Sequence, residues 1–237
     1  MNDDRAGDGR AVRLDERRRG IVRLPEALGR LPVYVPADTG LYKVARVVLP
    51  LVAQAYRLEA SGTEHLPLDG PALLAVNHQS DFDPWLVGVA FPRPMKFLAK
   101  SELFRVPVLQ RLIVALGAFP IERGVGDREA LRRSLDVLAA GEVLLMFPEG
   151  TRHTDGRVHD FQPGVGMLAL RSGAPVIPVA MKGNERFTTE GRLRFPKVRL
   201  MAGPPVDLSS LEGRRSEMYL AAAARIHEAV SGLYARL

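Results

Sequence analysis

The chain has 237 residues, 46% hydrophobic and 25% charged, a composition that excludes a fibrous repeat and a wholly disordered chain and fits one domain with a short extension. It contains no cysteine, which excludes disulfides, thiolate metal sites and cysteine nucleophiles and makes a cytoplasmic setting the expectation. The net charge of +6 favours anionic partners, namely nucleic acid, anionic lipid or phosphorylated small molecules.

The N-terminal part of the chain divides into two segments. Residues 1–38 combine dense charges of both signs with few apolar residues, which predicts a charged, disordered tail. Residues 39–60 contain the apolar stretch Leu41–Tyr56, which is rimmed by basic residues and interrupted by Pro50. It is shorter than the roughly 18 to 20 apolar residues of a spanning helix. It therefore predicts a helix that either lies at a membrane interface or packs on the domain.

From residue 61 to residue 237, short apolar segments alternate with segments of helical period. In chain order we expect a strand at 72–76, a helix at 84–90, a strand at 95–99, a helix at 102–116 interrupted by Pro107, a strand at 118–122, a helix at 127–140, a strand at 143–147, a helix at 164–171, a strand at 176–180, a strand or hairpin at 193–201 weakened by Pro196, and a helix at 216–237. This alternation predicts a single α/β domain with a mostly parallel or mixed central sheet flanked by helices.

The loop after the strand at 72–76, with the sequence NHQSDFDP, concentrates one histidine and two aspartates. A neutral histidine can take a proton from a hydroxyl, and it does so better when a carboxylate holds its other ring nitrogen. On a continuous helix His78 and Asp83 would point about 140° apart, so they can meet only across a turn. Asp83 as N-cap and Pro84 as first helical residue would make that turn. Asp81 is a rival partner, and the alternative that Asp83 only caps the helix stays open.

The loop after the strand at 143–147, with the sequence FPEGTR, has the residues of a phosphate cradle. Gly150 permits close backbone approach, Thr151 offers a hydroxyl and Arg152 a fork of donors. Glu149 could position a hydroxyl or pair with an arginine. The alternative is a turn with a surface salt bridge. Two further cations, Lys100 and Arg123, lie at a strand end or helix start. They would belong to the site only if the fold brings them close to these two loops.

These motifs, in this order, resemble the glycerolipid acyltransferase family, typified by the 1-acylglycerol-3-phosphate acyltransferases. NHQSDFD is similar to its N-H-x4-D block, KSELF with GAFPIER to its second block, FPEGTR to its third and VIPVA to its fourth. The resemblance covers about residues 66–201. It implies that His78 is the general base and Asp83 its orienter. It also implies that the acceptor phosphate is held by the block residues Lys100, Arg123, Glu149, Gly150, Thr151 and Arg152.

The implied reaction is acyl transfer from acyl-CoA or acyl carrier protein to the free hydroxyl of a lysophospholipid, with 1-acyl-sn-glycerol-3-phosphate as the expected acceptor. The family needs no metal or other cofactor, so none is expected. Many members bind membranes through N-terminal helices, so the resemblance favours the interfacial helix at 39–60 and a peripheral place on the inner face of the cell membrane. A different lysolipid or glycolipid acceptor stays open.

Two other function classes compete with this interpretation. A metal-dependent phosphoesterase would use clustered imidazole and carboxylate ligands, although no recognised metal spacing links them. Its candidate ligands are His78, Asp81, Asp83, His153, Asp155, His159 and Asp160. A nucleic-acid binder would explain the positive charge, but aromatic residues make up only 6% of the chain and are not interleaved with basic residues. We therefore expect no nucleic-acid partner.

Overall fold

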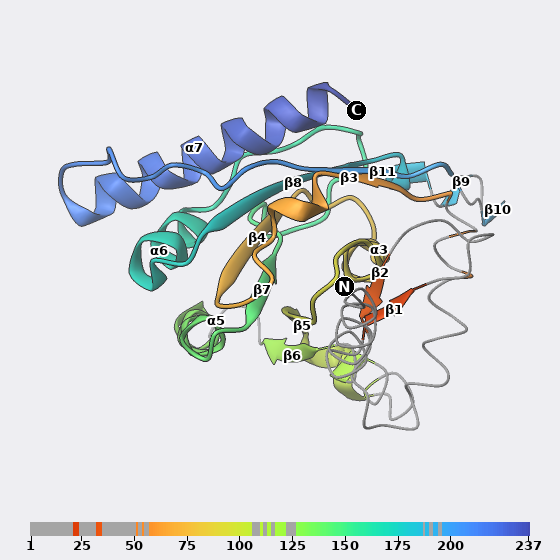
Figure 1. Cartoon of the computed structure of the whole chain (residues 1–237), viewed down its shortest axis with the longest axis horizontal. Coiled ribbons are helices and arrows are strands. Elements are labelled where there is room, and N and C mark those ends of the chain that lie inside the picture. Colours follow the sequence, from red (N-terminus) through yellow and green to blue (C-terminus); the bar gives the residue numbers. More distant parts are fainter. Residues whose placement is uncertain are drawn as a thin grey trace, which may run out of the picture.

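The computed structural model describes residues 21–23, 32–34, 51, 54, 57–105, 110, 113–114, 117–121, 127–186, 188–189, 192–193 and 196–237 (Figure 1). Its strands are β1 Ile21–Arg23, β2 Pro32–Tyr34, β3 Glu59–Ser61, β4 Ala72–Val76, β5 Met95–Lys100, β6 Ala118–Ile121, β7 Val143–Met146, β8 Val176–Lys182, β9 Thr188–Thr189, β10 Arg192–Leu193 and β11 Arg199–Ala202. Its α-helices are α3 Asp83–Ala90, α5 Asp127–Ala139, α6 Pro163–Ser172 and α7 Arg215–Ala235. Short 3₁₀ helices span Thr63–His65 (η2), Ser101–Arg105 (η3) and Asn184–Arg186 (η4).

One seven-stranded sheet organises the domain, in the order β3-β11-β8-β4-β7-β5-β6. The five strands from β8 to β6 run parallel, whereas β11 is antiparallel to β8 and parallel to β3. The prediction of a mostly parallel or mixed sheet is confirmed. β4 lies at the centre, and all five of its residues are buried, as expected for a strand covered by helices on both faces.

The alternation of side chains along the strands divides the core into two layers. Leu74 and Val76 of β4 pack with the apolar residues of α3 on one face. Leu73 and Ala75 pack on the other face with side chains from α5, α6 and α7. In Figure 1, α6 and α7 accordingly lie across the sheet from α3. Because both faces are covered, the edge where the parallel strands end is the open place for a site.

The predicted elements are confirmed for most of the described chain. The helices expected at 84–90, 127–140, 164–171 and 216–237 are α3, α5, α6 and α7. The expected stripe on the last helix is buried at Ala223, Ile226, Val230 and Leu233. Of the helix expected at 102–116, residues 101–105 form the 3₁₀ helix η3, and much of the remainder lies outside the described residues. Pro196 lies where the segment expected at 193–201 divides into β10 and β11.

Strand β3 was not predicted, because three residues at the sheet edge with only Ala60 partly buried give no apolar pattern. The sheet thus begins at Glu59, two residues before the expected domain boundary. The expected tail (1–38) and interfacial helix (39–60) lie mostly outside the described residues. The described part of the tail consists of β1 and β2, which pair antiparallel. No helix in the described part of the chain is long and apolar enough to cross a membrane.

Helices α6 and α7 approach each other closely, and this contact depends on Gly166. A Cβ atom at this position would lie 2.0 Å from the backbone oxygen of Tyr219 and 2.9 Å from the backbone nitrogen of Ala223. Real Cβ atoms essentially never approach backbone so closely, so any side chain at residue 166 must push the helices apart.

We expect Gly166→Ala to lower the free energy of unfolding by about 1–3 kcal/mol, since overpacking outweighs the gain in helix propensity. Urea denaturation measures this quantity. Gly164→Ala is the matched control, because the added Cβ would meet only Met146 Cε, at 4.0 Å. Equal stability of the two variants would contradict the close approach of α6 and α7.

Candidate active site

Three loops leave the sheet side by side at its carboxyl edge, because β8, β4 and β7 are neighbouring parallel strands. Residues 77–82, here the His78 loop, follow β4. Residues 147–162, here the Arg152 loop, follow β7 and lead into α6, while η4 follows β8. The two motifs singled out in the sequence therefore meet because their strands are adjacent, as the fold class predicts.

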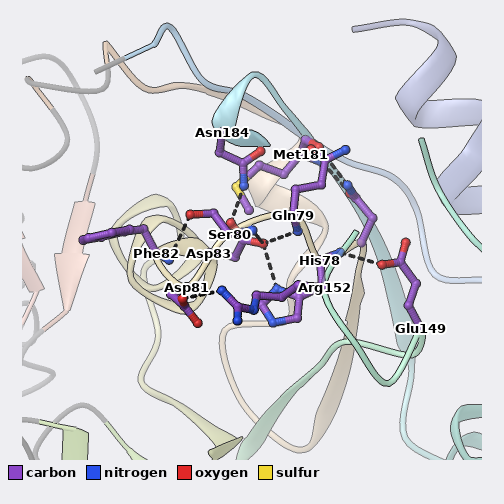
Figure 2. Close-up of polar contacts among 11 residues, drawn as sticks. His78, Gln79, Ser80, Asp81, Phe82, Asp83, Glu149, Arg152, Met181 and Asn184 are labelled. Carbon is purple, nitrogen blue, oxygen red and sulfur yellow. Dashed lines mark hydrogen bonds and ion pairs between the residues drawn. The ribbon is translucent and has the colours of Figure 1, made fainter. Parts of the chain in front are cut away.

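The His78 loop folds around the carboxylate of Asp83 (Figure 2). Asp83 Oδ2 accepts hydrogen bonds from the backbone nitrogens of Gln79 at 2.7 Å and Ser80 at 2.9 Å, and lies 2.8 Å from His78 Nδ1. Asn184 Nδ2 donates to the other oxygen, Oδ1. The Asp83 side chain is fully buried. The expected meeting of His78 and Asp83 across a turn is thus present.

One detail of that expectation is wrong. α3 begins at Asp83 itself, and its N-cap position is Phe82, which makes no side-chain cap bond. The Asp83 carboxylate turns back toward residues 79 and 80 instead of capping the helix ahead of it. The capping preference of Asp could not reveal this, because the same carboxylate can also accept from backbone N–H groups that precede it in the chain.

These bonds determine how the imidazole of His78 is held. Two backbone N–H groups donate to the Asp83 oxygen that faces His78 Nδ1, so this oxygen is placed to accept a further hydrogen bond from an Nδ1–H tautomer. In that tautomer the neutral ring keeps an unprotonated Nε2. The ring also stacks on Phe147 at 4.0 Å between centroids, with 19° between the planes. His78 remains 18% exposed, so its free edge is accessible to a small molecule.

Asp81, the rival partner of His78, has a different neighbour. Its side chain is 74% exposed and forms an ion pair with Arg152 of the Arg152 loop. Arg152 is itself 41% exposed, and Thr151 beside it is exposed. Figure 2 shows Arg152 and Asp81 beside the His78 loop. The ion pair therefore brings the predicted phosphate-binding arginine next to the predicted base.

Glu149 is buried and joins the two loops. Its Oε2 accepts the backbone N–H of His78 at 3.1 Å, and its Oε1 accepts that of His159 at 3.1 Å. Burial raises the pKa of Glu149 above its ordinary value, and the two backbone N–H bonds offset part of that rise. Gly150 follows with φ +75°, a conformation that suits glycine. The predicted cradle is thus a tight turn anchored by a buried carboxyl group.

Of the other two predicted cations, Lys100 lies within the described residues and Arg123 does not. Lys100 is the last residue of β5, which is the strand next to β7, so its backbone lies at the same edge of the sheet. Arg123 lies outside the described residues, two positions beyond the end of β6.

Sequence reasoning missed Asn77, Asn184 and Tyr234. Asn77 is buried and bridges β4 to β8, donating to the oxygen of Met181 at 2.9 Å and accepting from its nitrogen at 2.7 Å. Asn184 lies about a hundred residues from the Asp83 carboxylate that it contacts. No local pattern marks these partners. Only the buried strand before Asn77 could have indicated that its amide needs one.

Four of the candidate metal ligands of the phosphoesterase alternative lie on the Arg152 loop, namely His153, Asp155, His159 and Asp160. His153 and His159 stack with ring centroids 3.7 Å apart, and His159 Nε2 lies 2.9 Å from Asp155 Oδ2. Within the described parts of the chain, no three histidine, aspartate or glutamate side chains are grouped so as to hold a metal ion. The phosphoesterase alternative gains no support from this arrangement.

Comparison with known proteins adds a family match. The family model described as Acyltransferase matches residues 57–182. The chain is 30% identical over 157 residues to a chloroplast 1-acyl-sn-glycerol-3-phosphate acyltransferase of Arabidopsis thaliana, covering 64% of this chain and 44% of that protein. It is 27% identical over 172 residues to a 1-acyl-sn-glycerol-3-phosphate acyltransferase of Pseudomonas aeruginosa, covering 71% and 66% respectively. The match thus spans less than half the length of the plant relative.

Among solved structures, the chain is similar to the 1-acyl-sn-glycerophosphate acyltransferase from Thermotoga maritima. The TM-score is 0.62 at 25% identity, and the match covers 85% of this chain and 84% of that chain.

The raised pKa of Glu149 predicts a pH dependence of stability. Its folded-state pKa lies above the unfolded value, so the folded protein binds this proton more tightly and the ionised group costs stability at neutral pH. That cost disappears as the pH falls through the folded-state pKa toward the ordinary glutamate pKa of 4.5. We expect the free energy of unfolding of the wild type to rise relative to that of Glu149→Gln between pH 7 and that value, measured by urea denaturation.

Glu129→Gln supplies the control. Hydrogen bonds from Arg132 and Arg133 lower the pKa of the exposed Glu129 to about 2. Its contribution is therefore complete above the unfolded pKa and is lost only at lower pH. Its difference from wild type should stay flat where that of Glu149→Gln changes. A flat difference for Glu149→Gln as well would contradict the buried, raised carboxyl group.

Proposed function

Since the chain belongs to the acyltransferase family, whose model spans residues 57–182, we propose that it transfers a fatty acyl chain from an acyl thioester to the free hydroxyl of a lysophospholipid. The acceptor we propose is 1-acyl-sn-glycerol-3-phosphate, and the product is phosphatidic acid. The names of the Arabidopsis and Pseudomonas relatives support this acceptor.

The observation that carries the proposal is the contact of 2.8 Å between His78 Nδ1 and the buried Asp83 Oδ2. The carboxylate holds the ring with Nε2 unprotonated, and Nε2 takes the proton of the acceptor hydroxyl. The resulting alkoxide attacks the thioester carbonyl and forms a tetrahedral intermediate. The intermediate collapses to the ester and expels a thiolate, which takes the proton back from the imidazolium. The negative charge of Asp83 stabilises the imidazolium between these two steps.

The acceptor phosphate is assigned to the Arg152 loop. Arg152 and Thr151 are exposed beside His78, and the loop backbone turns at Gly150. A phosphate there would compete with Asp81 for the guanidinium, which can bind phosphate through two N–H groups. We assign Lys100 to the same anion, because β5 ends with it at this edge of the sheet. We assign Arg123 to it as well, since its segment GAFPIER is similar to the second block of the family. Glu149 holds the loop in place through its two backbone bonds.

The donor we propose is acyl-CoA or acyl carrier protein, both anionic and thus suited to a chain of net charge +6. The proposed acyl transfer needs no metal ion, because the imidazole moves the proton and the thiolate is a good leaving group. Since the acceptor is a membrane lipid, we place the protein peripherally on the inner face of the cell membrane.

The first test is replacement of the base. We expect wild-type protein to release thiol from oleoyl-CoA only when 1-acyl-sn-glycerol-3-phosphate is present, in detergent with excess chelator. His78→Ala should lower this rate by about 100- to 10,000-fold, the usual contribution of a general base. His65→Ala, in the 3₁₀ helix η2 away from the three loops, is the control and should match wild type.

Activity of His78→Ala within tenfold of wild type would refute the base assignment. Loss of wild-type activity in chelator would favour a metal enzyme instead. Thiol release only with another lysolipid or glycolipid, or only from acyl carrier protein, would correct the acceptor or the donor.

The second test separates acceptor binding from donor binding. Arg152→Ala should raise the KM for the acceptor by about tenfold, as expected for loss of one charge-assisted hydrogen bond, and leave the KM for oleoyl-CoA nearly unchanged. Arg171→Ala, in the last turn of α6, is the matched control. Equal losses for acceptor and donor would refute the phosphate role of Arg152.

A further inference from the structure

One residue of the C-terminal helix reaches both loops of the site. The hydroxyl of Tyr234, near the end of α7, accepts a hydrogen bond from Gln79 Nε2 at 3.1 Å and donates one to the oxygen of Gly156 at 2.8 Å. Gln79 belongs to the His78 loop and Gly156 to the Arg152 loop. Tyr234 is 155 residues from the first partner and 78 from the second. A single oxygen atom thus joins two loops that leave separate strands.

The partners of Tyr234 depend on it. Gln79 is 2% exposed, and in the described structure its Oε1 has no hydrogen-bond partner. The bond from Nε2 to Tyr234 is therefore the one that holds this buried amide. The backbone nitrogen of Gln79 also donates to Asp83 Oδ2, the atom that contacts His78. Movement of Gln79 would consequently shift the Asp83 carboxylate and, with it, the contact between Asp83 and His78.

The ring of Tyr234 is well held. It is half-buried, and Lys182 Nζ lies 4.9 Å from its centroid, within the range of a cation–π contact. Burial raises the pKa of the hydroxyl, so it remains a donor to Gly156 at neutral pH. Within the described part of the chain, no other hydrogen bond from a side chain of α7 reaches either loop.

We propose that Tyr234 is a positioning residue: its hydroxyl binds the loops of His78 and Arg152 and sets the distance between them together with Glu149 and the backbone bond from His153 N–H to the oxygen of His78. The inference rests on the proposed function, in which an acceptor held by its phosphate must present its hydroxyl to Nε2. Base and anion site lie on different loops, so their separation decides whether the bound acceptor reaches the base. A misplacement of about 1 Å can cost roughly a hundredfold in rate without weakening binding.

Tyr234→Phe isolates this role, since it keeps the ring and its contact with Lys182 and removes only the hydroxyl. We expect kcat to fall by about ten- to a hundredfold, the KM for acceptor and donor to stay within twofold, and the melting temperature to fall by only a few degrees, because the buried Gln79 amide loses its partner. Activity is therefore compared at a temperature where both variants are fully folded. Tyr219→Phe is the matched control. It lies on the same helix, and in the described structure its hydroxyl makes no hydrogen bond, so wild-type kinetics are expected.

Wild-type kcat in Tyr234→Phe would overturn the proposal. A fall in activity that only parallels a lower melting temperature would overturn it too, since that outcome indicates a structural role. Gln79→Met combined with Tyr234→Phe sharpens the result. If the tyrosine acts through Gln79, the double variant should be no slower than the slower single variant, and fully additive losses would count against it.

Hydrogen exchange tests the same claim without activity. We expect faster exchange in Tyr234→Phe, but not in Tyr219→Phe, at the backbone amides of Gln79, Ser80, His153 and His159. The amides of Gln79 and Ser80 donate to Asp83, that of His159 donates to Glu149 in its own loop, and that of His153 donates across to the oxygen of His78. Unchanged exchange in either loop would refute the proposal that the Tyr234 hydroxyl holds both loops. Wild-type protein without acyltransferase activity would refute the proposed function, and exchange would still decide on Tyr234.

Discussion

The site depends on one buried carboxylate. Asp83 is fully buried and accepts hydrogen bonds from two backbone amides of the His78 loop, from the imidazole of His78 and from the amide of Asn184. An isolated buried carboxylate is costly, and it is tolerated only when its oxygens are satisfied. The need to satisfy Asp83 therefore shapes the turn, and the turn presents the imidazole. Catalytic geometry and loop stability arise from the same bonds.

Around this carboxylate the chain ties its loops together with buried polar groups. Asn77 joins the end of β4 to β8, Glu149 joins the Arg152 loop to the backbone of His78, and Tyr234 brings in α7. Each joins segments that are distant in sequence but are brought to one sheet edge by the order β8-β4-β7. By contrast, the exposed ion pair of Arg152 with Asp81 contributes little to stability. This leaves the arginine available to an anionic ligand, as its proposed phosphate role requires.

How much of this could be read from the sequence depends on the range of the interaction. The strands and helices follow from local apolar period. The geometry of a turn permits His78 and Asp83 to meet, and the family resemblance implied that they do. The prediction that Asp83 caps the helix was wrong, since an aspartate before a proline can accept from the helix ahead of it or from the loop behind it, and here it accepts from the loop. Asn184 and Tyr234 could not be predicted, because their partners lie between 78 and 155 residues away. Sequence thus indicates the reacting groups, and only the fold shows what holds them.

The central claim, that Asp83 fixes the ring of His78 with Nε2 free to accept a proton, can be measured directly. A long-range proton–nitrogen NMR spectrum of protein with ¹⁵N-labelled histidine reports which ring nitrogen carries the proton, and His78→Gln assigns the signals. At a pH where the ring is neutral, we expect a protonated Nδ1 and an unprotonated Nε2. A proton on Nε2, or an even mixture of the two tautomers, would contradict it.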